Sequence, residues 1–274
     1  MQFQNWVLVF AIGFSSLPAA ADAPLLDNGY RHMYDLQFNE AHDSFHEFER
    51  NHPADPMGPA SDAAAYLFTE FDRMHILQSE FFVQEQHFYT DKKLAPDPEL
   101  KRRFEQDLAT ARRLAGSALA DANAQFALLL ARGLESDYLA LVEKRYGASF
   151  QEMKAGRQLA EQLLSAHPEY YDAWIAVGVE NYMLSVKPAP VRWLLRLAGG
   201  ETDRSLGIEK LRITASKGHY LAPFARLLLA VAALRDGNRK EAHDTLARLC
   251  QEYPHNPLYA QELARLQTAG GVAR

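Results

Sequence analysis

The stretch that decides the fold is residues 223–256, which read PFARLLLAVAALRDGNRKEAHDTLARLCQEYPHN. Apolar residues recur every three or four positions on both sides of Gly237, which predicts two amphipathic helices joined by a tight turn. The small residues Ala230 and Ala242 fall where the two helices would touch. Pro254 ends the second helix, because proline has no amide hydrogen to donate. The stretch therefore predicts one antiparallel helical hairpin.

The same spacing recurs around Pro53 and Pro168. With the closing proline at position 32 of a repeat of about 34 residues, small residues stand at positions 8 and 20. On Pro53 these positions hold Gly29 and Ala41. In the repeat that starts after Pro168, position 8 holds Gly178. The chain is therefore expected to contain several copies of one hairpin.

This spacing, with aromatic residues such as Phe45 at position 24, Phe48 at position 27 and Trp174 at position 4, resembles the tetratricopeptide repeat family. The resemblance implies an all-α, right-handed superhelical array of roughly five antiparallel hairpins. Arrays of this kind hold partners rather than carry out chemistry. Residues 33–41, MYDLQFNEA, resemble exported bacterial repeat proteins, and that resemblance implies no activity.

The array is expected to be irregular. A helix over residues 61–89, capped by Ser61 or Asp62, is predicted as its longest element. The repeat register is interrupted by an insertion at about residues 186–202, after which Gly207 falls at position 20. A closing helix is expected over residues 256–268. The repeat domain then covers residues 24–269, followed by a tail at 270–274.

The N-terminal residues resemble an export signal. The apolar run WVLVFAIGF at residues 6–14 is followed by small residues, which predicts a signal peptide over residues 1–23, cleaved after Ala21 or Ala23. No Lys or Arg precedes the run, which departs from the usual pattern. The run is shorter than the ~20 residues that cross a bilayer. We therefore expect a periplasmic or secreted protein.

Composition excludes several classes of function. The net charge is −6 and the charges alternate in sign along the helices, which argues against a nucleic-acid partner. Phosphate-loop, dinucleotide-binding and nucleophile-elbow motifs are absent from the sequence, so we expect neither an enzyme nor a cofactor. Cys250 is the single cysteine, for which a buried small residue is a better interpretation than a reactive or interchain thiol.

Two histidines are the strongest chemical pattern. His42 and His46 are four residues apart, a spacing with which one helix face binds a divalent metal. Arg50 stands where a zinc-protease motif would have its second histidine. In the repeat family these positions face solvent, so a solvated helix face is favoured over a metal site. A metal-binding protein, or a hydrolase with carboxylates gathered in the groove, remains the alternative.

The resemblance also implies a concave groove that binds a peptide or helix of a partner protein. Its wall would be polar in the middle of the array and apolar toward the C-terminus, which suits an amphipathic helix or an extended peptide. The alternative is that the apolar end packs on the closing helix. The expected partner-facing residues are Arg132, Glu135, Asp172, Val179, Tyr182, Met183, Leu227 and Arg235.

The insertion is the second candidate contact. It reads KPAPVRWLLRLAGG at residues 187–200, a short apolar helix that starts after two prolines and is stopped by two glycines. Trp193, Arg192 and Arg196 are residue types that concentrate binding energy at interfaces. Packing as a lid over neighbouring helices is the favoured interpretation, and a partner contact is the alternative. Two arginines are too few to hold such a helix on a membrane by themselves.

Overall fold

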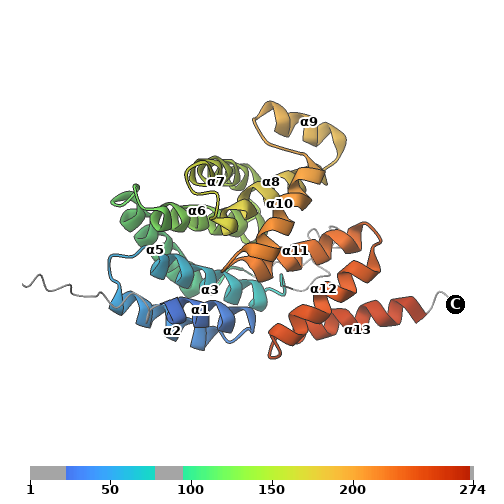
Figure 1. The fold of residues 1–274 in the computed structure, drawn as a ribbon, viewed down its shortest axis with the longest axis horizontal. Helices are drawn as coiled ribbons and strands as arrows, with labels where there is room; N and C mark the ends of the chain where they lie inside the picture. Colours follow the sequence, from blue (N-terminus) through green and yellow to red (C-terminus); the bar gives the residue numbers. More distant parts are fainter. Residues whose placement is uncertain (1–22, 78–94, 272–274) are drawn as a thin grey trace, which may run out of the picture.

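The computed structural model describes residues 23–77 and 95–271, and every regular element in these ranges is a helix (Figure 1). The predicted all-α class is confirmed. The predicted signal peptide lies outside the described residues, except for Ala23. None of the described helices is long and apolar enough to span a membrane. The α-helices are α1 (Ala23–Tyr34), α2 (Phe38–Asn51), α3 (Met57–Arg73), α5 (Pro98–Gly116), α6 (Ala122–Asp137), α7 (Tyr146–Ala166), α8 (Trp174–Ser185), α9 (Ala189–Leu197), α10 (Arg204–Lys217), α11 (Ala222–Arg235), α12 (Arg239–Glu252) and α13 (Pro257–Gly271).

The helices pack on their neighbours in sequence. The main pairs are α1 with α2, α3 with α5, α6 with α7, α8 with α10, and α11 with α12, and α13 packs on α12. The small residues predicted at the helix contacts lie there: a Cβ built on Gly207 of α10 would come within 2.6 Å of the backbone nitrogen of Tyr182 in α8. Ala230 and Ala242 are both buried. The predicted hairpin pairing across the insertion is therefore confirmed.

Local signals set several helix ends as expected. Asp97 caps α5 by accepting hydrogen bonds from the amides of Glu99 and Leu100, at 2.9 and 3.0 Å. Asp203 caps α10 through the amide of Leu206 at 3.0 Å. Gly237 has a φ of +72° in the turn between α11 and α12, a conformation that costs glycine little.

The predicted helix over residues 61–89 is wrong. Helix α3 begins at Met57, so Ser61 and Asp62 are not caps but buried residues inside the helix. The helix ends at Arg73, where His75 takes a φ of +57° and the chain turns back. A positive φ at a residue other than glycine leaves no mark in the sequence. Residues 78–89 of the predicted helix lie outside the described residues.

The C-terminal part of the predicted helix over residues 122–146 also differs. Helix α6 ends at Asp137 and is followed by a π-helical turn, Tyr138–Val142. Lys144 then has a φ of +59°, which lets α7 start at Tyr146. Among the described helices α7 is the longest, with 21 residues.

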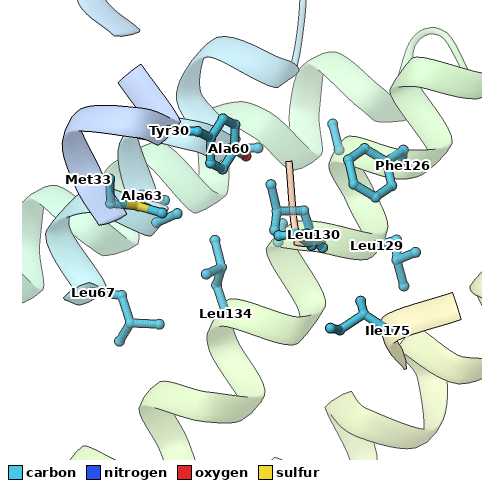
Figure 2. Close-up of a cluster of buried hydrophobic side chains, with 14 of the residues drawn as sticks. Tyr30, Met33, Ala60, Ala63, Leu67, Phe126, Leu129, Leu130, Leu134 and Ile175 are labelled. Atoms are coloured by element: carbon cyan, nitrogen blue, oxygen red, sulfur yellow. The ribbon is translucent and has the colours of Figure 1, made fainter. Parts of the chain in front are cut away.

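The first helices of successive pairs share one core. Figure 2 shows this cluster, to which α1, α3, α6 and α8 all contribute: Tyr30, Met33, Ala60, Ala63, Leu67, Leu130, Leu134 and Ile175. The two ends of the array also touch. The Tyr34 hydroxyl donates to the Tyr220 carbonyl at 3.0 Å, and the Asn256 side chain donates to the Tyr34 carbonyl at 2.8 Å. Helix α1 therefore lies against the last hairpins.

Candidate functional site

The structure places two of the predicted groove residues in the core. Tyr182 is 1% exposed and Asp172 is 5% exposed, so neither can contact a partner in this conformation. Both carboxylate oxygens of Asp172 accept backbone hydrogen bonds, from the amides of His219, Tyr220 and Leu221 at 2.9, 3.0 and 3.0 Å. Asp172 thus holds the turn that leads into α11, and its expected place on an open wall is corrected.

The polar middle of the predicted groove is an ion-pair network across α5, α6 and α7. Arg132 donates to Glu152 at 2.8 Å, and Glu135 pairs with Arg112. All four side chains are partly buried. The network joins three helices, so a structural role accounts for these charges.

The apolar end of the predicted groove is largely covered by the chain itself. Val179 and Met183 pack against the main core, and Leu227 packs against a second cluster formed between α11, α12 and α13. Arg235 is partly buried at the end of α11. For Leu227 the structure supports the alternative in which the apolar end packs toward the closing helix.

Helix α9 is the opposite case, because its apolar face is open. Val191, Trp193, Leu194 and Leu197 are 41%, 61%, 58% and 69% exposed, and none of the residues of α9 is buried. The helix stands apart from the other helices at the upper right of Figure 1. The lid that we favoured from the sequence is therefore wrong: the insertion projects from the fold.

Helix α9 is nevertheless held firmly at both ends. Arg192 donates to the Lys187 carbonyl at 2.8 Å, and Arg196 donates to the Thr202 hydroxyl at 2.5 Å. Gly199, with a φ of +83°, closes the C-terminus as predicted. Lys154 of α7 adds a bond to the Ala198 carbonyl at 3.0 Å.

Two buried polar residues of α8 fix the returning strand of the insertion. Glu180 accepts from the Glu201 amide and Asn181 accepts from the Asp203 amide, both at 3.0 Å. Glu180 is 0% exposed, and its burial raises its pKa, although the Arg157 guanidinium lies 3.1 Å away and acts in the other direction. The apolar face of α9 is therefore displayed on a rigid base.

The second candidate is a cluster of histidines and carboxyls between α2, α3 and α5. His42 and His46 bind the two oxygens of Asp62, with Nδ1–Oδ1 and Nε2–Oδ2 distances of 2.5 and 2.9 Å. The Asp62 side chain is 2% exposed and the His42 side chain 16%. The expected solvated histidine face is corrected: α2 turns both rings toward α3.

Two further carboxyls join this cluster. Burial and the nearby carboxyls of Asp62 and Glu49 raise the pKa of Asp107 to about 8. Burial, with Asp62 nearby, also raises the pKa of Glu49. The burial of Asp62 acts to raise its pKa, but the hydrogen bonds from both imidazoles outweigh burial and lower it. The hydrogen bond to Asp62 raises the pKa of His46.

The cluster has the features of an internal network rather than of a reaction centre. Over residues 23–77 and 95–271, no group of three or more His, Cys, Asp or Glu side chains converges as metal ligands do. One cleft of about 830 Å³ lies between α10, α11 and α12, and another of about 480 Å³ lies between α1, α11 and α12. None of the cluster residues lines either cleft.

The sequence contained one signal for this cluster that the analysis missed. Asp62 stands in the run Pro59–Ala65, PASDAAA, whose small residues are buried. A lone carboxylate on a helix face of alanines requires a partner when the face is buried. His42 and His46 are that partner, on the neighbouring helix of the same core.

Comparison with known proteins adds no relative: no protein-family model matches this chain, and no curated protein matches it significantly.

Proposed function

We propose that this protein is a non-catalytic protein–protein interaction scaffold of the cell envelope, and that α9 is its contact element. The observation that carries the proposal is the open apolar face of α9 on a rigidly held helix. Large apolar side chains exposed together mark interaction sites in soluble proteins. Trp193, the largest of them, is of the residue type most enriched among binding hot spots.

The pattern on α9 favours a groove on another protein as the occupant. Pro190, Trp193, Leu194 and Leu197 follow the i, i+3, i+4, i+7 spacing of helices that bind in apolar grooves. The helix is already formed and fixed, so little conformational entropy is lost on binding. In this proposal the chain donates a helix, whereas the sequence analysis expected it to receive one.

Charge describes the groove further. Residues 181–200 contain Lys187, Arg192 and Arg196 and no acidic residue, although the whole chain has a net charge of −6. The hydrogen bonds of both arginines to the base of the insertion reduce what they offer to lipid phosphates, but leave their positive potential. An apolar groove with an acidic rim is therefore the complementary partner.

The finer description of the fold belongs to the same proposal. The close approach of paired helices at Gly178 and Gly207 supports an array similar to tetratricopeptide repeats. The absence of reaction motifs from the sequence supports a role without catalysis. The apolar run at residues 6–14 supports export to the periplasm or the medium.

Export has a direct test. Mass spectrometry of the protein isolated from cells is expected to give a mature chain that begins at Asp22 or Pro24, because the small residues before these positions suit the signal peptidase. A chain that retains Met1 in a cytosolic fraction would contradict export.

Trp193→Ala is expected to change the melting temperature by less than about 1 °C, because the side chain it removes is exposed and contributes little to the core. Trp174→Ala is the matched control. Trp174 is partly buried and lies under Lys210, so its loss is expected to lower the melting temperature by several degrees, at about 2–4 °C per kcal/mol. Equal losses in the two variants, measured by circular dichroism, would show that α9 packs on the fold in solution.

The same pair of variants tests what α9 binds. A photo-crosslinker placed at Leu194 in cells is expected to join one partner protein, and Trp193→Ala is expected to abolish that product while Trp174→Ala does not. Purified protein is expected neither to sediment with phosphatidylglycerol vesicles nor to dimerise. Sedimentation that depends on Trp193 would replace the protein partner with a lipid surface, and dimerisation would replace it with a second copy of the chain.

A further inference from the structure

The His42–Asp62 cluster joins three helices through titratable groups. Helix α2 contributes His42, His46 and Glu49, α3 contributes Asp62 and Tyr66, and α5 contributes Asp107 and Arg103. The Tyr66 and His42 rings lie 4.1 Å apart between centroids. No residue of either cleft belongs to this set, and α9 lies elsewhere in the chain. The proposed function therefore leaves the cluster unexplained.

The contacts of Asp62 depend on a proton. Its two oxygens accept from His42 and His46, and Asp107 also hydrogen-bonds its carboxyl group. Two carboxylates cannot hydrogen-bond each other unless one of them carries a proton, because an ionised carboxylate only accepts. Glu49 adds a third carboxyl, of which one oxygen is buried without a hydrogen-bond partner.

We propose that this cluster is a proton-dependent latch, which holds α5 against α2 and α3 while Asp62 and Asp107 share a proton and loosens when that proton is lost. The step is one ionisation: the O–H bond of the Asp107 carboxyl breaks, its electron pair stays on the oxygen, and the proton passes to water. Two carboxylates then face each other beside Glu49, and their repulsion opposes the packing of α5.

The direction of the pH dependence follows from the shifted groups. The pKa values of Asp107 (about 8), His46 and Glu49 are all raised. A group with a raised pKa contributes stability below its unfolded pKa, and that contribution is lost as the pH rises through its folded pKa. Asp62 acts in the opposite sense, but its window lies below about pH 4, because its pKa is lowered. The latch therefore closes in mild acid and loosens toward pH 9.

The test is the thermal unfolding of the full chain between pH 5 and pH 9.5. The wild-type melting temperature is expected to fall by about 5 °C between pH 6 and pH 9. Asp107→Asn keeps an amide hydrogen for Asp62 and cannot ionise, so it is expected to remove most of that fall. Asp43→Asn is the control, because Asp43 is exposed on the same helix as the histidines. Identical pH profiles for Asp107→Asn and the wild type would overturn the latch.

Hydrogen exchange at pH 9 locates the effect. Amides of α5 are expected to exchange about tenfold faster in the wild type than in Asp107→Asn at the same pH, whereas amides of α12 exchange equally. If Asp107→Asn does not fold, carboxyl carbon resonances of the wild type provide the test. One Asp carboxyl is expected to titrate near pH 8. If every Asp carboxyl titrates below pH 6, the proposal is refuted.

Discussion

Replacing Asp172 with alanine is expected to lower the free energy of unfolding by about 3–5 kcal/mol. The carboxylate accepts hydrogen bonds from the three consecutive amides of residues 219–221, at 2.9 to 3.0 Å. Alanine leaves these donors without their acceptor at the start of α11. A hydrogen bond to a charged group contributes about 1.5–3 kcal/mol, and bonds that share one acceptor add less than their sum.

Urea denaturation followed by circular dichroism measures this loss, and two variants calibrate it. Asp172→Asn keeps one acceptor oxygen and is expected to lose about half as much. Asp121→Ala removes an exposed cap of α6 that accepts from the Asn123 amide at 3.0 Å, and is expected to cost about 1 kcal/mol. A loss for Asp172→Ala no larger than for Asp121→Ala would return Asp172 to the list of candidate partner contacts.

Gly207→Ala is expected to cost about 3 kcal/mol, the upper part of the range for overpacked sites. The added Cβ would lie 2.6 Å from the backbone nitrogen of Tyr182 and 3.1 Å from the Gly178 carbonyl oxygen. Backbone atoms cannot move aside as the end of a side chain can. Helices α8 and α10 would have to separate, and the buried residues between them would lose contact.

Gly133→Ala is the matched control. Gly133 lies in the middle of α6, and a Cβ built there meets no atom within 4 Å. Alanine is the better helix former, so this change is expected to raise the free energy of unfolding by about 0.5–1 kcal/mol. If both substitutions stabilised the protein in the same urea experiment, α8 and α10 would not be in close contact at Gly207 in solution.

The helical pairs were predictable because their signals are local. Helix α2 matches its predicted bounds, and α10 begins directly after the predicted cap Asp203. The glycines at repeat positions 8 and 20 predicted the contact of α8 with α10 across the insertion. Close packing of two helices requires small residues at fixed intervals, so the requirement is visible in the chain.

The helix ends that the sequence missed lack such signals. His75 and Lys144 take positive φ angles without being glycine, so α3 and the turn after α6 end where the pattern continues. Asp62 was interpreted as a cap because a carboxylate before an apolar run is typical of one. Its true partners, His42 and His46, lie on another helix, and no spacing rule connects them to it.

The sequence by itself determined which residues form helices, which helices pair, and that the insertion at residues 186–202 carries an apolar helix. Periodicity shows that a face is apolar, but what covers the face depends on residues far apart in the chain. The contacts of Tyr34 with Tyr220 and Asn256 bring α1 against the last hairpins, and the predicted groove residue Leu227 packs toward α12 and α13. No helix covers α9, because its base is fixed to α8 while its apolar face points away from the core. Which apolar surface stays open was therefore decided by the tertiary structure alone.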